Sequence, residues 1–87
     1  MFSKPDKLDF SFTGKKVKTI CKCYATKQKS TINIPKIYYL VPLGSIGEIR
    51  VVSTDQEYNI ESFLVKFTIE GQYYYCKLSK NMLDFID

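Results

Sequence analysis

Apolar and polar residues alternate near the start of the chain in a way that is typical of extended backbone. Leu8, Phe10 and Phe12 lie two residues apart with polar residues between them, and a period of two places them on one face of a strand. A threonine and a glycine at 13–14 then predict a turn. Residues 1–7 lack the alternation, and we expect them to form a flexible N-terminal arm.

Residues 15–26 continue the alternation and predict one long strand. One face carries small side chains that suit a core, namely Val17, Thr19, Cys21, Cys23 and Ala25. The opposite face is basic with two apolar members, Ile20 and Tyr24, and is therefore expected to lie in solvent. Residues 27–30 are polar and predict a loop.

The middle of the chain is dense in residues that favour strands, but proline and glycine interrupt it. Because Pro35 cannot donate to a ladder, residues 31–34 are at best a piece of edge strand. Residues 37–41 are apolar on both faces, which predicts a central strand or one covered by the N-terminal arm. A turn follows at 42–44, and Gly47 inside an extended pattern indicates a bulge or a close backbone approach.

The C-terminal third predicts a loop and then a β-hairpin of defined register. Residues 53–61 are polar and are expected to form a loop, and a two-residue turn at 70–71 fixes the pairing of the strands that follow. The inner pairs are then Phe63 with Leu78, Val65 with Cys76, and Phe67 with Tyr74, and the outer pairs are Leu64 with Lys77, Lys66 with Tyr75, and Thr68 with Tyr73. A shift of one residue would mix the two sets, although Glu70 is an uncommon first turn residue and leaves a three-residue loop with a bulge as an alternative.

The pattern as a whole predicts a mainly β protein of about five to six short antiparallel strands that form a small barrel. Ser79 can cap one helical turn, in which Met82, Leu83 and Ile86 form a short apolar face. Residues 8–87 are expected to form a single β-barrel domain after the arm, since the chain of 87 residues is too short for two domains.

One stretch of the sequence resembles a known superfold. Residues 40–67 contain Val41-Pro42-x-Gly44-x-x-Gly47-x-Ile49-x-x-Val52 and then Val65-x-Phe67. This pattern resembles small stand-alone SH3-like barrels of bacteria and their mobile elements. The resemblance implies the fold and a general role in docking peptides, proteins or nucleic acids, but no activity. The chain lacks the Ala-Leu-Tyr-Asp-Tyr opening of the eukaryotic signalling version and contains no tryptophan, which argues against a groove for proline-rich peptides.

Charge is distributed unevenly along the chain. Residues 1–44 hold nine lysines against two acids, for a net charge of +7, and residues 45–87 hold four basic residues against seven acids, for −3. This asymmetry indicates either an anionic partner or complementarity between the two halves, unless the lysines only keep the protein in solution. No segment has the apolar length of a membrane span and the N-terminus lacks the apolar run of a signal peptide, so we expect a cytoplasmic protein that has no contact with membranes.

The residue types needed for common catalytic sites are missing from the sequence. There is no histidine, and residues 44–47 lack the Gly-Lys-Ser/Thr ending of a phosphate-binding loop. Cys21, Cys23 and Cys76 have neither the number nor the spacing of a structural zinc site, and they fit better as small core residues. We therefore expect a protein that is not an enzyme and holds no metal or cofactor.

The sequence contains two candidate binding surfaces. The outer face of the predicted hairpin, together with the polar loop, offers a protein-docking site at Lys66, Tyr73, Tyr75 and Tyr58. The alternative is sequence-independent nucleic-acid binding by a lysine-rich strand at Lys16, Lys18, Lys22, Tyr24, Lys27 and Lys29. We favour a non-enzymatic module that docks a protein, as a regulator or inhibitor from a phage or other mobile element does, and both a monomer and a homodimer are compatible with the sequence.

Overall fold

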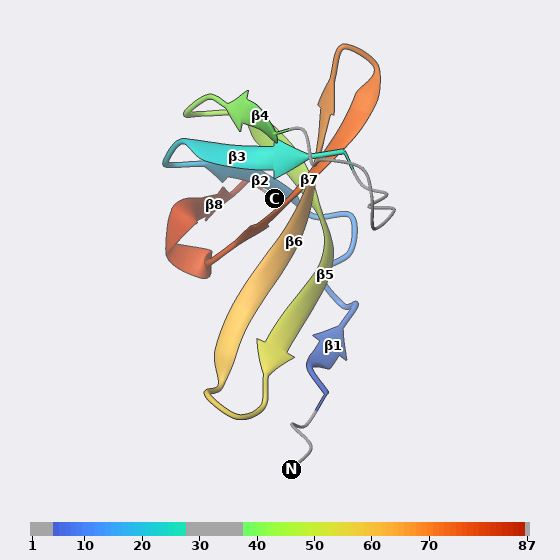
Figure 1. Ribbon diagram of the computed structural model, residues 1–87, viewed down its shortest axis with the longest axis vertical. Coiled ribbons are helices and arrows are strands. Elements are labelled where there is room, and N and C mark those ends of the chain that lie inside the picture. Colours follow the sequence, from blue (N-terminus) through green and yellow to red (C-terminus); the bar gives the residue numbers. More distant parts are fainter. Residues whose placement is uncertain (1–4, 28–37, 87) are drawn as a thin grey trace.

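A computed structural model describes residues 5–27 and 38–86, which form eight short strands and one 3-10 turn (Figure 1). The elements are β1 (Lys7–Asp9), β2 (Lys16–Thr19), β3 (Cys23–Thr26), β4 (Tyr38–Val41), β5 (Ile46–Asp55), β6 (Ile60–Ile69), β7 (Gln72–Leu78), η1 (Lys80–Met82) and β8 (Leu83–Phe85). The strand order in the antiparallel sheet is β4-β3-β7-β6-β5-β2-β8, with β1 beside β5. The sheet curls into a half-barrel, which confirms the mainly β class and the small barrel with a short C-terminal helical turn.

The hairpin formed by β6 and β7 has the predicted register. Each of the six expected pairs is present, from Phe63 opposite Leu78 to Thr68 opposite Tyr73. Glu70 and Gly71 both adopt positive φ angles, of 51° and 78°, as the two central residues of a type I′ turn must. The alternative three-residue loop with a bulge is therefore excluded. A type I′ turn matches the twist of the two strands that it connects.

The single strand predicted over residues 15–26 is wrong at one point, because the chain bends at residues 20–22 between β2 and β3. The segment that pairs with these residues, from β4 into β5, bends at the same place. Lys16 pairs with Glu48 in β5 and Cys23 pairs with Val41 in β4, so the same register continues on both sides of the bend. Thr19 anchors this corner. Its buried hydroxyl donates to the carbonyl of Pro42 at 3.2 Å and accepts from the amide of Ser45 at 3.0 Å.

The core lies on the concave side of the curled sheet. It consists of Val17, Cys23, Ala25, Val41, Ile49, Val52, Phe63, Val65, Phe67, Leu78 and Leu83, with Tyr74 and Cys76 packed at its margin. The predicted inner faces of residues 15–26 and of the hairpin are thus confirmed, except that Cys21, Tyr74 and Cys76 are only half-buried. Gly47 makes a close backbone approach, since a Cβ atom there would lie 2.5 Å from Cγ1 of Val65.

The structure differs from the sequence-based predictions at β4 and at residues 53–61, which were expected to form a loop. Residues 38–41 form an edge strand whose first three side chains are exposed, and they do not form a central strand. Residues 53–55 and 60–61 belong to a long hairpin of β5 and β6 with a four-residue turn at 56–59. β1 pairs with β5 at this end of the hairpin, and both faces of the sheet are accessible to solvent there. The strands therefore contain polar residues, and their sequence pattern resembles that of a loop.

The C-terminal helical face predicted from Met82, Leu83 and Ile86 is also wrong. Only residues 80–82 form a 3-10 turn, and Ser79 makes no side-chain cap to its backbone. Leu83 is buried in β8, whereas Ile86 is exposed. The predictions for residues 31–34 and for Ile37 lie outside the described residues. Within the described residues, no helix is long and apolar enough to cross a membrane.

Candidate functional site

One row of paired residues connects the predicted protein-docking surface with the predicted lysine-rich strand. Lys16 lies opposite Glu48, Glu48 opposite Lys66, and Lys66 opposite Tyr75. The row continues from Tyr75 to Thr26 and from Thr26 to Tyr38. Directly paired residues point to the same side of a sheet, so all six side chains lie on the outer, convex side of the half-barrel.

The part of this convex side that β6, β7, β3 and β4 form is called the tyrosine–lysine face. Alternation along the four strands assigns to it Leu64, Lys66, Thr68, Tyr73, Tyr75, Lys77, Tyr24, Thr26, Tyr38 and Leu40. None of these residues is acidic. The face thus combines four tyrosines with two lysines on neighbouring strands.

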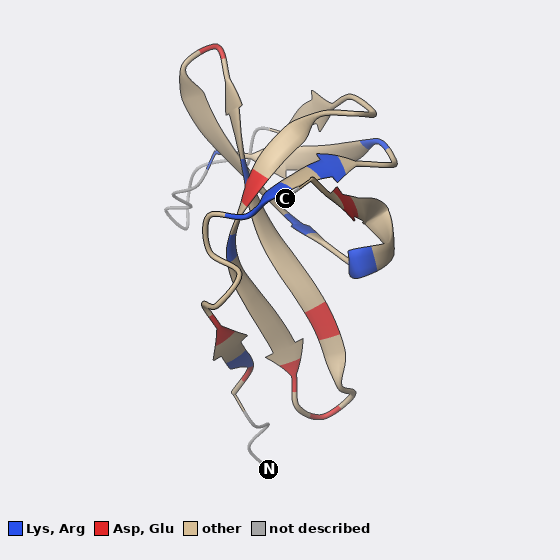
Figure 2. Cartoon of the chain, turned by 180° about the vertical axis from the view of Figure 1, so that it is seen from behind, with Lys and Arg blue, Asp and Glu red and all other residues tan. Residues whose placement is uncertain are grey.

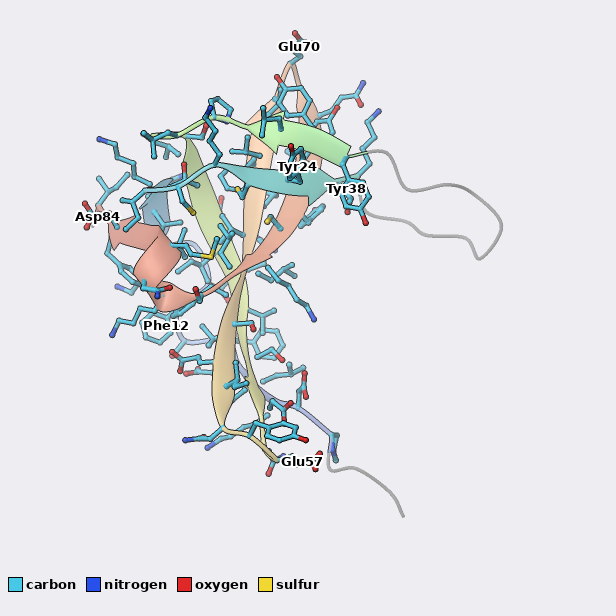
Figure 3. All side chains as sticks on the ribbon, turned by 60° about the vertical axis from the view of Figure 1, so that its left-hand side comes forward. Phe12, Tyr24, Tyr38, Glu57, Glu70 and Asp84 are labelled. Carbon is cyan, nitrogen blue, oxygen red and sulfur yellow. The ribbon has the colours of Figure 1, made fainter. Side chains whose placement is uncertain are left out.

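Three tyrosines of this face are largely exposed. Tyr24 is 64%, Tyr38 59% and Tyr73 55% accessible, and Figure 3 shows Tyr24 and Tyr38 extending from neighbouring strands on the same side of the sheet. Tyr75 is half-buried between Lys66 and Thr26. Exposed rings supply a large contact area with few rotatable bonds, which is why tyrosine is frequent at protein interfaces.

Lys66 is held in place on this face by two neighbours. Its Nζ atom lies 4.5 Å above the ring centroid of Tyr73 and 3.9 Å from Oε2 of Glu48. The ammonium group therefore makes a cation–π contact and an ion pair at the same time. Lys66 and Tyr73, both predicted as site residues, are brought together and restrict each other's rotamers.

Sequence reasoning missed Tyr38 and Leu40 as members of the face. Both were assigned to a strand with two covered faces, because an apolar run on both sides normally indicates burial. Leu40 lies directly opposite Tyr24 and is exposed. The only signal in the sequence was Pro35 nearby, since proline is confined to sheet edges.

The lysines of the proposed nucleic-acid strand do not form one continuous track. Lys16 lies 3.9 Å from Glu48, which also accepts a hydrogen bond of 3.2 Å from Arg50. Lys18 is opposite Asp84 of β8, and Lys22 lies in the bend after β2. Acidic residues therefore alternate with these lysines, and of the predicted residues that the structure describes, only Tyr24 belongs to the tyrosine–lysine face.

The remaining predicted residues lie elsewhere. Lys27 follows β3, and its Nζ atom is 6.0 Å from the ring centroid of Tyr74, which in turn packs on Tyr39 with ring centroids 5.2 Å apart. Tyr58 lies in the turn between β5 and β6, at the end of the molecule opposite the turn at 70–71 (Figure 3). Lys29 lies outside the described residues.

Cys23 and Cys76 lie on the concave side of β3 and β7, and Cys21 lies in the bend before β3. Burial raises the pKa of Cys23 and raises the pKa of Cys76 to about 12. All three are free thiols. Within the ranges 5–27 and 38–86, no cluster of three or more Cys, Asp or Glu side chains is arranged to hold a metal ion.

The raised pKa values predict unreactive thiols. In a Cys21→Ser variant, we expect Cys23 and Cys76 to react with a disulfide reagent at pH 8 at least about tenfold more slowly in the folded protein than in urea, because the thiolate is the nucleophile. The release of the chromophore over time measures both rates. Equal rates in the folded and unfolded protein would show that packing does not protect the buried Cys23 and the half-buried Cys76.

Comparison with protein-family models, with curated proteins and with solved structures finds no match to this chain.

Proposed function

We propose that this protein is a non-enzymatic binding module that docks another protein through the tyrosine–lysine face. The observation that carries the proposal is the set of three largely exposed tyrosines, Tyr24, Tyr38 and Tyr73, on one face whose own residues include no acid. Single exposed apolar residues are common on proteins, but a group of large rings on adjacent strands is typical of interaction surfaces.

The chemistry of the face favours a protein partner with acidic and apolar groups. Tyrosine rings can bury apolar area while their hydroxyl groups bond to polar atoms of the partner. Lys77, and Lys66 at the side of Tyr73, supply positive charge beside the rings. Partner carboxylates would therefore be attracted, whereas a basic partner would be repelled.

The finer parts of the proposal follow from the sequence. We propose an SH3-like barrel that acts in the cytoplasm as a regulator or inhibitor encoded by a phage or other mobile element. The small size, the absence of histidine from the sequence and the exposed rings support a role in binding over one in catalysis.

Binding of nucleic acid through the lysine-rich strand is the alternative function. Exposed tyrosines can stack on bases, which favours it, but the lysines that would follow the phosphates are interrupted by Glu48 and Asp84. A phosphate track interrupted by carboxylates would lose much of the electrostatic attraction on which non-specific binding depends. The protein partner is therefore the better-supported proposal.

The proposal predicts that removal of two rings abolishes docking. In a Tyr24→Ser/Tyr73→Ser variant, we expect affinity for the partner to fall by at least about tenfold, because truncated hot-spot residues typically lose 2 kcal/mol or more. The partner is first identified by mass spectrometry of what the wild-type protein retains, and the affinity is then measured by calorimetry with the purified partner.

Ile20→Ser/Leu43→Ser is the matched control, because it also removes two exposed apolar side chains, at 50% and 61% accessibility, from outside the face. The control should bind as the wild type does. Equal affinity for the wild type and the Tyr24→Ser/Tyr73→Ser variant would reject the face. Salt-sensitive binding of a labelled oligonucleotide that Lys16→Glu/Lys18→Glu/Lys22→Glu abolishes would instead establish the nucleic-acid function.

A further inference from the structure

A second surface lies on the extension of the sheet that β1 and the distal parts of β5 and β6 form. This acidic arm comprises residues 5–9 and 53–62 and projects from the half-barrel (Figure 1). Glu57 at its tip and Glu70 in the turn between β6 and β7 lie at opposite ends of the molecule (Figure 3). The arm is thus a different surface from the tyrosine–lysine face, which it meets on β6 between Ser62 and Leu64.

The charge of the arm is opposite to that of the rest of the molecule. Five acids, Asp6, Asp9, Asp55, Glu57 and Glu61, stand against Lys7, for a net charge of −4. The other described residues, 10–27, 38–52 and 63–86, carry nine basic side chains against three acidic ones, for +6 (Figure 2). The uneven distribution of charge along the sequence therefore corresponds, in the structure, to a negative acidic arm and a positive remainder of the molecule.

Large apolar side chains are exposed on the side of the arm that carries Asp6 and Asp55, whereas Asp9 and Glu61 lie on the other side with Lys7. Leu8 is 54%, Ile60 59% and Tyr58 69% accessible. Leu8 lies opposite Ser53 and Ser53 opposite Ser62, so Leu8 shares the outer side of the arm with Ile60, two residues from Ser62. The arm therefore offers apolar contact area beside its carboxylates.

Hydrogen bonds hold the tip of the arm in one conformation. Oδ1 of Asp55 accepts from the backbone amides of Glu57 at 2.8 Å and Tyr58 at 3.2 Å. The N-terminal segment is tied to the hairpin, since Ser53 Oγ donates to Asp6 Oδ2 at 2.8 Å and Gln56 Nε2 donates to the Pro5 carbonyl at 2.7 Å. A surface organised in this way loses little conformational entropy when it binds.

We infer that the acidic arm is a second docking site, for a protein segment in which lysine or arginine alternates with apolar residues. Basic side chains of that segment pair with the carboxylates around the tip, and its apolar residues cover Leu8, Tyr58 and Ile60. The charge of −4 attracts basic side chains and repels nucleic acid and anionic lipid surfaces, so a basic protein segment is the occupant that complements the arm. The inference goes beyond the proposed function, because it assigns a different surface and a partner of opposite charge.

The experiment uses a short synthetic peptide of alternating lysine and leucine, added to the ¹⁵N-labelled full-length protein. We expect the amide signals of residues 6–9 and 53–62 to shift and those of residues 70–75 to stay unchanged. A Glu57→Lys/Glu61→Lys variant should bind the peptide at least about tenfold more weakly, because two attractive charges become repulsive.

Glu70→Lys/Asp84→Lys is the matched control, since it changes the net charge by the same amount outside the arm. This control should bind the peptide as the wild type does, and so should the Tyr24→Ser/Tyr73→Ser variant that tests the other face. Failure of the arm and failure of the tyrosine–lysine face are therefore distinguishable. Ile60→Ser should weaken binding while leaving the charge intact.

Three results would overturn the inference. The first is equal loss of affinity in the arm variant and in its charge-matched control. The second is equally strong binding of a peptide whose leucines are replaced by serine, since only unspecific charge attraction would then remain. The third is self-association of the free protein that Glu57→Lys/Glu61→Lys abolishes in sedimentation, because the basic body of a second copy would then be the occupant.

Discussion

A Phe63→Ala variant is expected to lose a large part of the stability of the fold. Phe63 is 2% exposed and is among the largest fully buried side chains. Its ring packs edge-on against Phe12 at a centroid distance of 6.1 Å and against Phe85 at 6.0 Å. It therefore connects β6 with the turn before β2 and with β8. Replacing a buried phenylalanine by alanine lowers the free energy of unfolding by about 3–5 kcal/mol, out of roughly 4–13 kcal/mol for a chain of this length.

Urea denaturation followed by circular dichroism measures this loss. The matched control is Phe10→Ala, since Phe10 is 63% exposed and its removal should change the free energy of unfolding by no more than about 0.5 kcal/mol. If Phe63→Ala and Phe10→Ala had similar midpoints, Phe63 would not lie in the core. A Phe63→Ala protein that is unfolded without urea would agree with the prediction, and Phe63→Leu then provides a variant whose stability can be measured.

The sequence predicts Phe63 as a core residue because the residues of the hairpin are sufficient to fix the register of its two strands. The strands on either side of Glu70 and Gly71 both alternate, and only one pairing keeps their apolar sets on one side. The pairing partners are also close in sequence. A local pattern is enough to determine such an element, which is why the positions of Val65 and Cys76 could be predicted as well.

The bend between β2 and β3 could not be predicted in this way. The small residues Val17, Thr19, Cys23 and Ala25 keep their alternation through it, so nothing in the local pattern marks the corner. Its cause is a contact with residues 42–45, more than 20 positions away, where the hydroxyl of Thr19 binds. Non-local contacts of this kind are not visible in the period of one strand.

The candidate site was only partly predictable for the same reason. The exposed outer face of the hairpin, with Tyr73 and Lys66, follows from local alternation. Its union with Tyr24 depends on a single pair between β3 and β7, Thr26 opposite Tyr75, and that pairing brings together segments about 50 residues apart in the sequence. The acidic arm was not recognised because its polar strands resemble a loop when β1 is not known to pair with them.

The close approach at Gly47 leads to the second large effect, which is expected for Gly47→Ala. The added Cβ would lie 2.5 Å from Cγ1 of Val65 and 2.9 Å from Cε1 of Phe67. Both neighbours are buried, at 0% and 2% exposure, so they cannot swing into solvent. Overpacking of this kind typically costs about 1–3 kcal/mol and occasionally more, and contacts of this length place Gly47→Ala at the upper end of that range.

A double-mutant cycle with Val65→Ala separates this clash from a general effect of alanine at position 47. Val65→Ala removes the Cγ1 atom that the new Cβ would meet, so Gly47→Ala should be less destabilising in that background, by about 1 kcal/mol or more. Relief is only partial, since the ring of Phe67 stays within 3.0 Å of the same position. Additive losses in urea denaturation would show that Val65 does not limit the space at Gly47, and would contradict the packing of β5 against β6 at this point.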